Sequence, residues 1–488
     1  MDNNKLKEGM KLIDSHFKNN GLSRRDAIKF FGVSGTAAIF ATTSTTQLSA
    51  NSNAKGKILI IGGGLAGIST AARLSNYLNK PDITIVEPND LSASYQPGQT
   101  LVGAGVWSKS DVMYDNKDYI PDGVKHIKAK AVEFDPDNNS VKLNNGTTIK
   151  YDFLVISSGL KLDYGQIDGL EADKTITTVG DYKSAGPHLG KNGVTSIYYQ
   201  QGSDDTWIEM QKFLNSAKNA KSSKKVQGVF THPNTPIKCG GAPKKIMYLT
   251  DARLREIDAR DNAELTFYPN GSKMFGVPEY HDAIKSQFEA RDMKWNYKHN
   301  LVAVDINNKI ATFENKWTVK EMDDTLGIEI NKYHKKKVEV PYDFLHITPP
   351  MKAAEEIGNS DVGSSSGWVP VNKETLQHKT YNNIFSLGDI AAVPMGKTGG
   401  SVRKQYKVLV DNLISLMEGK EMTAKYAGYT VCPLITGLGT VMLAEFNWTK
   451  KPTPSFPLDP TQERWIWWLL KVYLLKPMTQ YGLLAGRA

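Results

Sequence analysis

The chain of 488 residues has only two cysteines, Cys239 and Cys432, almost two hundred residues apart. In an exported protein, a cysteine pair most often forms a structural disulfide. A pair can also act as a redox couple, because a thiolate that attacks a disulfide sulfur moves an electron pair. Lys238, Lys244 and Lys245 lie beside the first cysteine and would lower the pKa of its thiol if they face it. These residues alone leave both roles open.

A glycine-rich turn near the start of the chain is the second chemical feature. Gly62, Gly64 and Gly67 follow a short apolar run at G-x-G-x-x-G spacing, and small residues suited to a helix come next. A second apolar run ends at Glu87, twenty residues past Gly67, where a carboxylate can bind a ribose diol. The pyrophosphate would lie at the helix N-terminus. Residues 57–87 therefore predict a βαβ unit that binds a dinucleotide.

Two later segments carry groups that suit a flavin. One buried apolar run ends at Gly159, and another ends at Gly388 and Asp389, whose carboxylate can accept a hydrogen bond from a ribityl hydroxyl. Lys397 then precedes a predicted helix that begins with a glycine pair. The positive helix N-terminus and the lysine would stabilise negative charge on a reduced flavin ring. The alternative for Lys397 is an ordinary solvated lysine.

A second dinucleotide is not expected. The strand predicted at 226–230 is followed by THPNTPIKCGGAPKK, where a nicotinamide-binding domain would carry its own glycine loop. Prolines and Cys239 occupy that loop, and Gly240 and Gly241 lack the three-glycine spacing. Further strands are predicted at 264–268 and 310–313. We expect the chain to re-enter the first domain at a buried strand over 342–348.

The two ends of the chain suggest export and a membrane surface. Arg24 and Arg25 precede an apolar stretch over 30–40 that is too short to span a bilayer, which is typical of a twin-arginine signal. A disordered arm is the alternative. Residues 463–476, ERWIWWLLKVYLLK, are Trp-rich, apolar and flanked by lysines, a pattern that favours the membrane interface. A helix packed on the protein, or a dimer interface, is the alternative.

The net charge of +9 would suit anionic lipid or an anionic substrate. The sequence has no basic motif interleaved with aromatic residues, so a nucleic-acid partner is not expected. It also shows no metal-ligand cluster, and we predict no metal site.

With these segments read, the chain resembles the sulfide:quinone oxidoreductases from about Lys57 to its end, most closely the branch that includes the mitochondrial enzymes. The resemblance rests on the glycine loop and on YQPGQTLVGAG, NTPIKCGGAPKKIMYL, GDIAAVPMGKTGG and GYTVCPLITG. It implies an α/β fold with two Rossmann-like dinucleotide-binding domains, the second degenerate, and a C-terminal membrane-associated module. The implied domains are a signal and linker at 1–54, the FAD-binding domain at 55–160 and 341–418, the degenerate NAD-binding-like domain at 161–340, and a quinone and membrane module at 419–488.

The resemblance also implies roles for single residues. Cys239 and Cys432 would form the redox-active pair: hydrosulfide leaves a persulfide on Cys432, Cys239 passes the electrons to the flavin, and a membrane quinone receives them. Non-covalent FAD would be bound by Gly62, Gly64, Leu65, Ala66, Gly67, Glu87, Gln96, Ala131, Gly159, Gly388, Asp389, Lys397, Thr398, Gly399 and Gly400. Val431 is a candidate wall of the quinone site. Family members more often carry alanines where Gly399 and Gly400 stand.

The implied enzyme oxidises a sulfur donor with a quinone acceptor and forms sulfane sulfur or polysulfide. With the signal, we expect it as a peripheral homo-oligomer on the periplasmic face of a bacterial inner membrane. One alternative is the flavin subunit of flavocytochrome c sulfide dehydrogenase, which needs a further cysteine to bind its flavin covalently. Another is a single-subunit NADH:quinone oxidoreductase, which needs the missing second glycine loop. A cofactor-binding scaffold with a structural disulfide is the non-enzymatic alternative. The sulfur acceptor, the quinone type and the assisting acid or base remain open, with His232 and Glu445 as candidates.

Overall fold

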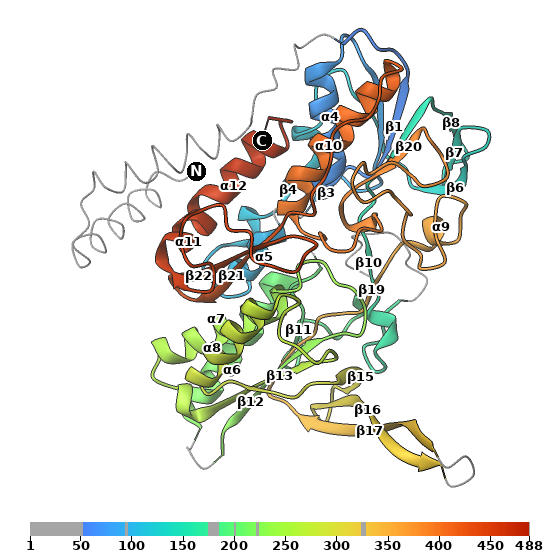
Figure 1. Cartoon of the computed structure of the whole chain (residues 1–488). Helices are drawn as coiled ribbons and strands as arrows, with labels where there is room; N and C mark the ends of the chain where they lie inside the picture. The colour runs from blue at the N-terminus through green and yellow to red at the C-terminus, as the bar shows by residue number, and fades with distance from the viewer. Residues whose placement is uncertain are drawn as a thin grey trace, which may run out of the picture.

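The structure is a computed structural model that describes residues 52–92, 96–173, 185–199, 202–220, 224–323 and 328–487. The predicted twin-arginine signal lies outside these residues. Two parallel sheets form the two halves of the molecule, and a C-terminal segment lies against the first half (Figure 1). This is the predicted α/β fold with two Rossmann-like units.

The first sheet has the strand order β20-β9-β1-β2-β5. Its strands are β1 (Lys57–Ile61), β2 (Asp82–Val86), β5 (Lys125–Ile127), β9 (Phe153–Ile156) and β20 (Ile384–Ser386). The central strand β1 is buried along its length after Lys57, as its apolar run predicts. Two helices that lie side by side, α4 (Leu65–Tyr77) and α10 (Gly399–Met417), start near the ends of β1 and β20. The N-termini of both helices are thus available to one cofactor.

A hairpin turns at Asn144, Asn145 and Gly146, residue types that are typical of a tight turn. It joins β7 (Ser140–Leu143) to β8 (Thr148–Lys150), beside β6 (Ala131–Asp135), in a small antiparallel sheet.

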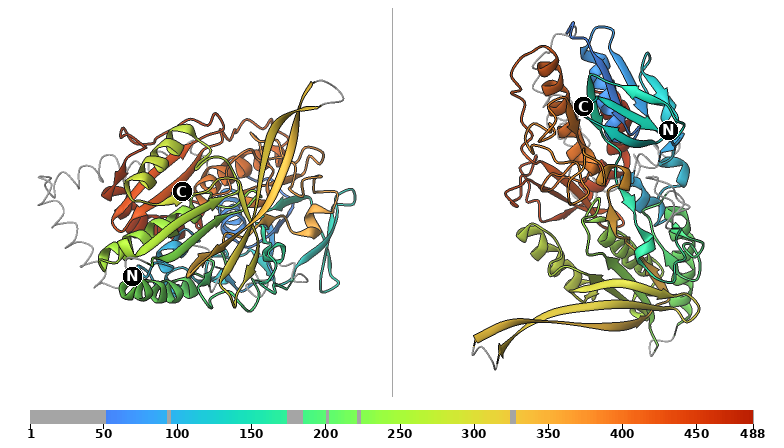
Figure 2. Two further views of the ribbon diagram at one scale, coloured as in Figure 1. Left: turned by 90° about the horizontal axis from the view of Figure 1, so that it is seen from below. Right: turned by 90° about the vertical axis from the view of Figure 1, so that its right-hand side faces the viewer.

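The second sheet has the order β11-β18-β12-β13-β14. Its strands are β11 (Val194–Thr195), β12 (Val226–His232), β13 (Ala263–Pro269), β14 (Lys294–Trp295) and β18 (Phe344–His346). The helices of this half are α6 (Gly202–Asn219), α7 (Ala242–Glu256) and α8 (Pro278–Ala290). The strand predicted at 310–313 begins β16 (Ile310–Asp323), which pairs with β15 (His299–Asp305) and β17 (Ile328–Pro341) in a separate sheet. In Figure 2, β16 and β17 extend away from the body as a long ribbon.

The predicted return of the chain at 342–348 is wrong. Phe344–His346 is β18, which lies between β11 and β12 in the second sheet. The chain crosses between the two halves at a two-stranded ribbon, β10 (Lys161–Leu162) with β19 (Met351–Lys352). A short buried strand has the same apolar pattern in either parallel sheet, so the sequence could not assign β18 to one of them.

The C-terminal segment contains a hairpin that the sequence did not reveal. β21 (Thr430–Gly437) pairs with β22 (Thr440–Phe446), and the short β23 (Glu463–Arg464) follows on the other edge. The Trp-rich run is an irregular helix, with α11 (Trp465–Leu469), a wider turn at Leu470–Leu474 and α12 (Leu475–Pro477). Among the described residues, no helix is both long and apolar enough to span a membrane.

Candidate active site

The glycine loop after β1 needs its glycines for different reasons. Gly62 has a φ of +105°, and a Cβ there would lie 2.6 Å from the Ser157 carbonyl oxygen. A Cβ on Gly67 would lie 1.9 Å from the carbonyl oxygen of Gly62, so helix and strand pack directly on each other. A Cβ on Gly64 would meet nothing within 4 Å. The N-terminus of α4 therefore faces open space, as a pyrophosphate site requires.

Glu87 lies at the end of β2, beside this loop. Its carboxylate accepts hydrogen bonds from the backbone N–H groups of Gly63 at 2.8 Å and Asn89 at 2.9 Å. Burial raises its pKa, and these hydrogen bonds oppose the shift. A cavity of about 80 Å³ is lined by Gly62, Glu87 and Ala131. These residues fit the adenosine end of a dinucleotide.

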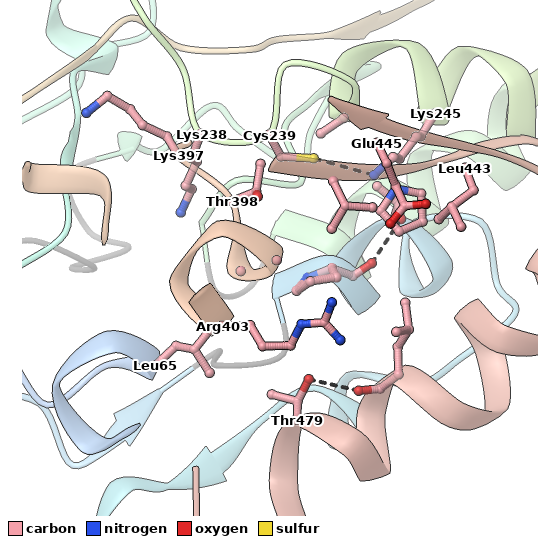
Figure 3. Close-up of a pocket in the computed structure, with 18 of the residues that line it drawn as sticks. Leu65, Lys238, Cys239, Lys245, Lys397, Thr398, Arg403, Leu443, Glu445 and Thr479 are labelled. Carbon is pink, nitrogen blue, oxygen red and sulfur yellow. Dashed lines mark hydrogen bonds between the residues drawn. The ribbon is translucent and has the colours of Figure 1, made fainter. Parts of the chain in front are cut away.

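A larger cavity of about 260 Å³ lies where the two halves of the molecule and the C-terminal segment meet. It brings together seven of the predicted catalytic and FAD-binding residues, namely Leu65, Cys239, Asp389, Lys397, Thr398, Gly399 and Gly400. In Figure 3, Cys239 and Lys245 lie on one side of this cavity, and Arg403 and Thr479 lie on the other. The start of α10 lies between them, so a flat ring bound there would have one face toward the sulfur and one toward the C-terminal segment.

Lys397 is held in place by backbone groups. Its ammonium donates hydrogen bonds to the carbonyl oxygens of Asp389 and Ala391 and lies 3.8 Å from the centre of the Trp368 ring. Burial lowers its pKa to about 8, while burial raises the pKa of the Asp389 carboxyl. Lys397 is therefore a partly buried lysine beside Asp389, and the solvated alternative is wrong.

The start of α10 is shaped by its small residues. Thr398 caps the helix, and its hydroxyl accepts a hydrogen bond from Ser401 N–H at 3.1 Å. A Cβ on Gly400 would lie 2.1 Å from a methyl carbon of Val431, which also lines the cavity. Glycine at this position lets the strand that carries Cys432 pack against the helix start.

The fold brings the two cysteines together. Cys239 lies in the loop before α7 with a φ of +52°, which is unusual for a residue with a side chain. Its N–H donates to the Lys397 carbonyl oxygen at 3.0 Å, so the cysteine loop is fixed to the loop before α10. Cys432 is buried on β21, and a Cβ on Gly241 would lie 2.4 Å from its sulfur. Gly241 thus makes room for Cys432 at the N-terminus of α7.

The electrostatic surroundings distinguish the two thiols. The hydrogen bond with Cys432 and the nearby Lys245 ammonium hold the pKa of Cys239 well below its usual range, against the effect of burial. The same hydrogen bond and burial raise the pKa of Cys432. Lys245 donates to the Cys239 sulfur at 3.4 Å, whereas Lys244 bonds the Gly240 carbonyl oxygen and does not line the cavity. Cys239 is therefore the more acidic thiol of the pair.

Lys471 is a functional candidate that the sequence reading missed. It comes from the Trp-rich segment, is fully buried, and donates to the Pro97 carbonyl oxygen at 2.7 Å. Burial and the Lys245 charge lower its pKa to about 7, while both cysteines oppose this shift. A lone lysine within an apolar run was the available signal, because a buried lysine needs a partner.

The remaining predicted residues lie at the edges of the site. Gly159 and Gly388 follow β9 and β20 with φ values of +72° and +75°, and Ala66 lies in the first turn of α4. Gln96 begins a short turn whose next residue, Pro97, lines the larger cavity. His232 is absent from the cavity lining, and burial lowers its pKa to about 4.

The site and fold define a class. A strand, glycine loop and helix for a dinucleotide stand beside a cysteine pair, and residues 56–193 match the family model described as Pyridine nucleotide-disulphide oxidoreductase. Relatives extend the comparison over most of the chain. The mouse mitochondrial sulfide:quinone oxidoreductase is 36% identical over 86% of this chain and 84% of its own length, and the one from Dictyostelium discoideum is 37% identical over 88% and 86%.

A solved structure shows the same fold. The sulfide:quinone oxidoreductase of Aquifex aeolicus superposes with a TM-score of 0.66 at 19% identity, covering 89% of this chain and 92% of that one. This chain belongs to the sulfide:quinone oxidoreductase family, so it is an oxidoreductase, and its cofactor is FAD. The open N-terminus of α4, the Glu87 cavity and the start of α10 fit that cofactor.

Proposed function

We propose that the chain oxidises hydrogen sulfide to sulfane sulfur or polysulfide and passes the electrons through Cys239, Cys432 and non-covalently bound FAD to a membrane quinone. One observation carries this proposal: two cysteines distant in sequence meet beside the cavity that also contains Asp389 and the start of α10. A structural disulfide has no need of a lysine at 3.4 Å or of a place beside the flavin site. The names of the relatives support sulfide and quinone as the substrates.

The sulfur chemistry follows from the properties of the two thiols. In the oxidised enzyme, hydrosulfide attacks the Cys432 sulfur of the disulfide, which leaves a persulfide on Cys432 and releases the Cys239 thiolate. Cys239 suits the role of leaving group, because a thiol with a lower pKa leaves more readily as its thiolate. Lys245 and Lys471 stabilise its negative charge. Bound FAD supplies the two-electron carrier between the sulfur side and the quinone side of the cavity.

For FAD, we propose contacts at both cavities. Gly62, Gly64, Ala66 and Gly67 would hold the pyrophosphate, and Glu87 and Ala131 would contact the adenosine. Along the ribityl chain and ring, the proposed FAD contacts are Leu65, Gln96, Gly159, Gly388, Asp389, Lys397, Thr398, Gly399 and Gly400. Both cysteines lie together at the sulfur side, so neither is left to attach the flavin covalently as the flavocytochrome alternative requires.

The test is an anaerobic titration of the purified enzyme. We expect sulfide to bleach the oxidised flavin absorbance and a short-chain quinone to restore it, while NADH leaves it unchanged. Bleaching by NADH but not by sulfide would replace the proposal with NADH:quinone oxidoreduction. Flavin that stays with the protein after denaturation would reopen the flavocytochrome alternative.

We also propose a peripheral site on the periplasmic face of a bacterial inner membrane, as a homo-oligomer. The twin-arginine pattern supports export, and the half-buried Trp465, Trp468 and Tyr473 support contact with lipid. Trp467 packs inside the protein, so part of this segment serves the fold. Replacing Trp468 and Tyr473 by serine should weaken binding to lipid vesicles and leave flavin content unchanged. Unchanged vesicle binding would contradict the membrane contact.

A further inference from the structure

The side of the larger cavity away from the cysteines is mostly apolar. Its walls come from the C-terminal segment and include Phe456, Leu470, Leu475, Met478 and Leu483. An apolar slot beside the start of α10 suits the ring of a quinone, whose two carbonyl oxygens are the atoms on which negative charge develops during reduction. The polar side chains of this slot therefore decide how those oxygens are bound.

Most polar groups here already have partners. The Glu445 carboxylate accepts hydrogen bonds from the Tyr429 hydroxyl and from the N–H and hydroxyl of Ser455, the last two at 2.8 and 2.6 Å. The Thr479 hydroxyl donates to the Leu475 carbonyl oxygen at 2.8 Å. These polar groups therefore form their hydrogen bonds with other groups of the protein.

Arg403 is different. It lies one turn into α10, is half-buried and lines the cavity, and Figure 3 shows its guanidinium directed toward the middle of the cavity. It forms no hydrogen bond or ion pair with any residue that the structure describes, and its nearest aromatic contact is the Tyr429 ring at 6.0 Å. A guanidinium has five N–H donors and stays charged, so its partial burial calls for an acceptor.

The neighbouring cations of α10 do not share this position. Lys404 and Lys407 are also half-buried, but neither lines the cavity. A headgroup phosphate of a lipid would be expected to use all three cations together. The placement of Arg403 alone inside an apolar slot favours a neutral ring with a carbonyl oxygen.

We propose that Arg403 is a catalytic residue of the quinone half-reaction: its guanidinium donates a hydrogen bond to one quinone carbonyl oxygen and stabilises the negative charge that develops there. This inference rests on the proposed function. The quinone takes two electrons from the reduced flavin and two protons from solvent to give the hydroquinone. Arg403 supplies no proton, because an arginine guanidinium stays charged in proteins.

The experiment separates the two half-reactions by anaerobic rapid mixing, first with sulfide and then with a short-chain quinone in detergent. In the Arg403→Met variant, we expect flavin reoxidation at saturating quinone to slow by about 100-fold, the usual effect of losing one such donor, and reduction by sulfide to change by less than about twofold. Arg403→Lys keeps the charge and should be intermediate. Lys407→Met is the matched control on the same helix and should behave as the wild type in both steps.

Each other result has a definite meaning. A wild-type enzyme that sulfide does not reduce, or that quinone does not reoxidise, would overturn the proposed function itself. A working wild type with normal reoxidation in Arg403→Met would overturn this inference alone. The inference would also be overturned if Arg403→Met lost binding to vesicles that contain phosphatidylglycerol but was reoxidised normally in detergent. That result would assign Arg403 to lipid binding. Flavin content and melting temperature identify a misfolded Arg403→Met variant. In that case, the reoxidation rate of Arg403→Lys tests the inference.

Discussion

The same structural unit is used in two ways in the two halves of the molecule. In the first half, β1 leads through Gly62 and Gly64 into α4, and a Cβ on Gly64 would meet nothing. In the second half, β12 leads through a longer loop into α7, and the Cys432 sulfur occupies the space beside Gly241. One helix N-terminus is left open for a phosphate and the other is filled by sulfur. A helix N-terminus stabilises the negative charge of a phosphate or of a thiolate such as that of Cys239, two residues before Gly241, so the two halves differ mainly in the loop that precedes the helix.

This comparison gives the physical reason why we expect no second dinucleotide in the second half. The loop before α7 carries the prolines Pro233 and Pro236 and ends at Cys239, whose N–H is bonded to the Lys397 carbonyl oxygen. Its two glycines, Gly240 and Gly241, lack the three-glycine spacing of a pyrophosphate loop, and the Cys432 sulfur fills the space beside Gly241. In the proposed mechanism, the second half instead contributes the Cys239 thiolate to the cofactor of the first.

The largest effect is expected at the cysteines. Cys239→Ser and Cys432→Ser should each slow flavin reduction by sulfide by about 1,000-fold or more, since either removes the disulfide that sulfide attacks. Flavin content should stay at the wild-type level, because neither residue supports the glycine loop. Stopped-flow absorbance and the ratio of flavin to protein measure the two quantities. Normal reduction in either variant would mean that the pair is structural.

The next largest effect is expected at Gly64, in the turn before α4, where a Cβ would meet nothing within 4 Å. Gly64→Ala should leave the melting temperature of the flavin-free protein unchanged but weaken FAD binding by about tenfold, or about 1.4 kcal/mol, because the new methyl meets only the ligand. Gly67→Ala should instead prevent folding, since its Cβ would overlap the Gly62 carbonyl oxygen. Equal flavin affinity in Gly64→Ala and the wild type would show that the pyrophosphate lies elsewhere.

The turn before α7, where the Cys432 sulfur lies, offers a matched pair of adjacent glycines, Gly240 and Gly241. Gly241→Ala should displace Cys432 and slow reduction by sulfide by about 10- to 100-fold, with FAD retained, since small misplacements of reacting groups are costly. Gly240→Ala, whose Cβ would meet nothing within 4 Å, is the control and should reduce normally. Equal rates in the two variants would contradict the proposed packing at α7.

Much of the fold could be predicted from the sequence, because it depends on local patterns. The glycine loop, β1, β9 and the 144–146 hairpin follow from apolar runs that lead into glycine or asparagine, and β12 follows from an apolar run that leads into a proline-containing loop. The assignment of β18 failed, because partner choice between two parallel sheets is not encoded in a three-residue strand. The pairing of Cys239 with Cys432 entered through the resemblance, since no local pattern links residues so far apart.

The site was less accessible than the fold. Lys397 and Asp389 could be found because they follow strand and glycine signals. Arg403 could not, because Lys404 and Lys407 lie on the same helix and only tertiary packing places Arg403 alone of the three at the cavity. For Lys471, the single signal was its position within an apolar run. The Trp-rich segment shows the same limit, since its composition suggests lipid while Trp467 and Lys471 are buried in the protein.

The smallest effect is expected from Lys471, the lysine of the C-terminal segment whose charge acts on Cys239. Lys471 helps to lower the pKa of Cys239, and its own pKa is about 7. The stabilising charge is therefore present below about pH 7 and is lost as the pH rises through that value. In the reduced enzyme, Lys471→Met should raise the pKa of the Cys239 thiol by about 0.5 to 1 unit, a difference of about 1 kcal/mol between its protonation states.

The rate of thiol alkylation measured against pH reports this shift. Lys476→Met is the matched control, because Lys476 lies in the same segment but bonds Asp111, and its curve should overlie that of the wild type. If Lys471→Met also leaves the curve unchanged, the hydrogen bond with Cys432 and the Lys245 ammonium keep the pKa of Cys239 low without Lys471. The C-terminal segment would then act on Cys239 through Cys432 and not through the charge of its buried lysine.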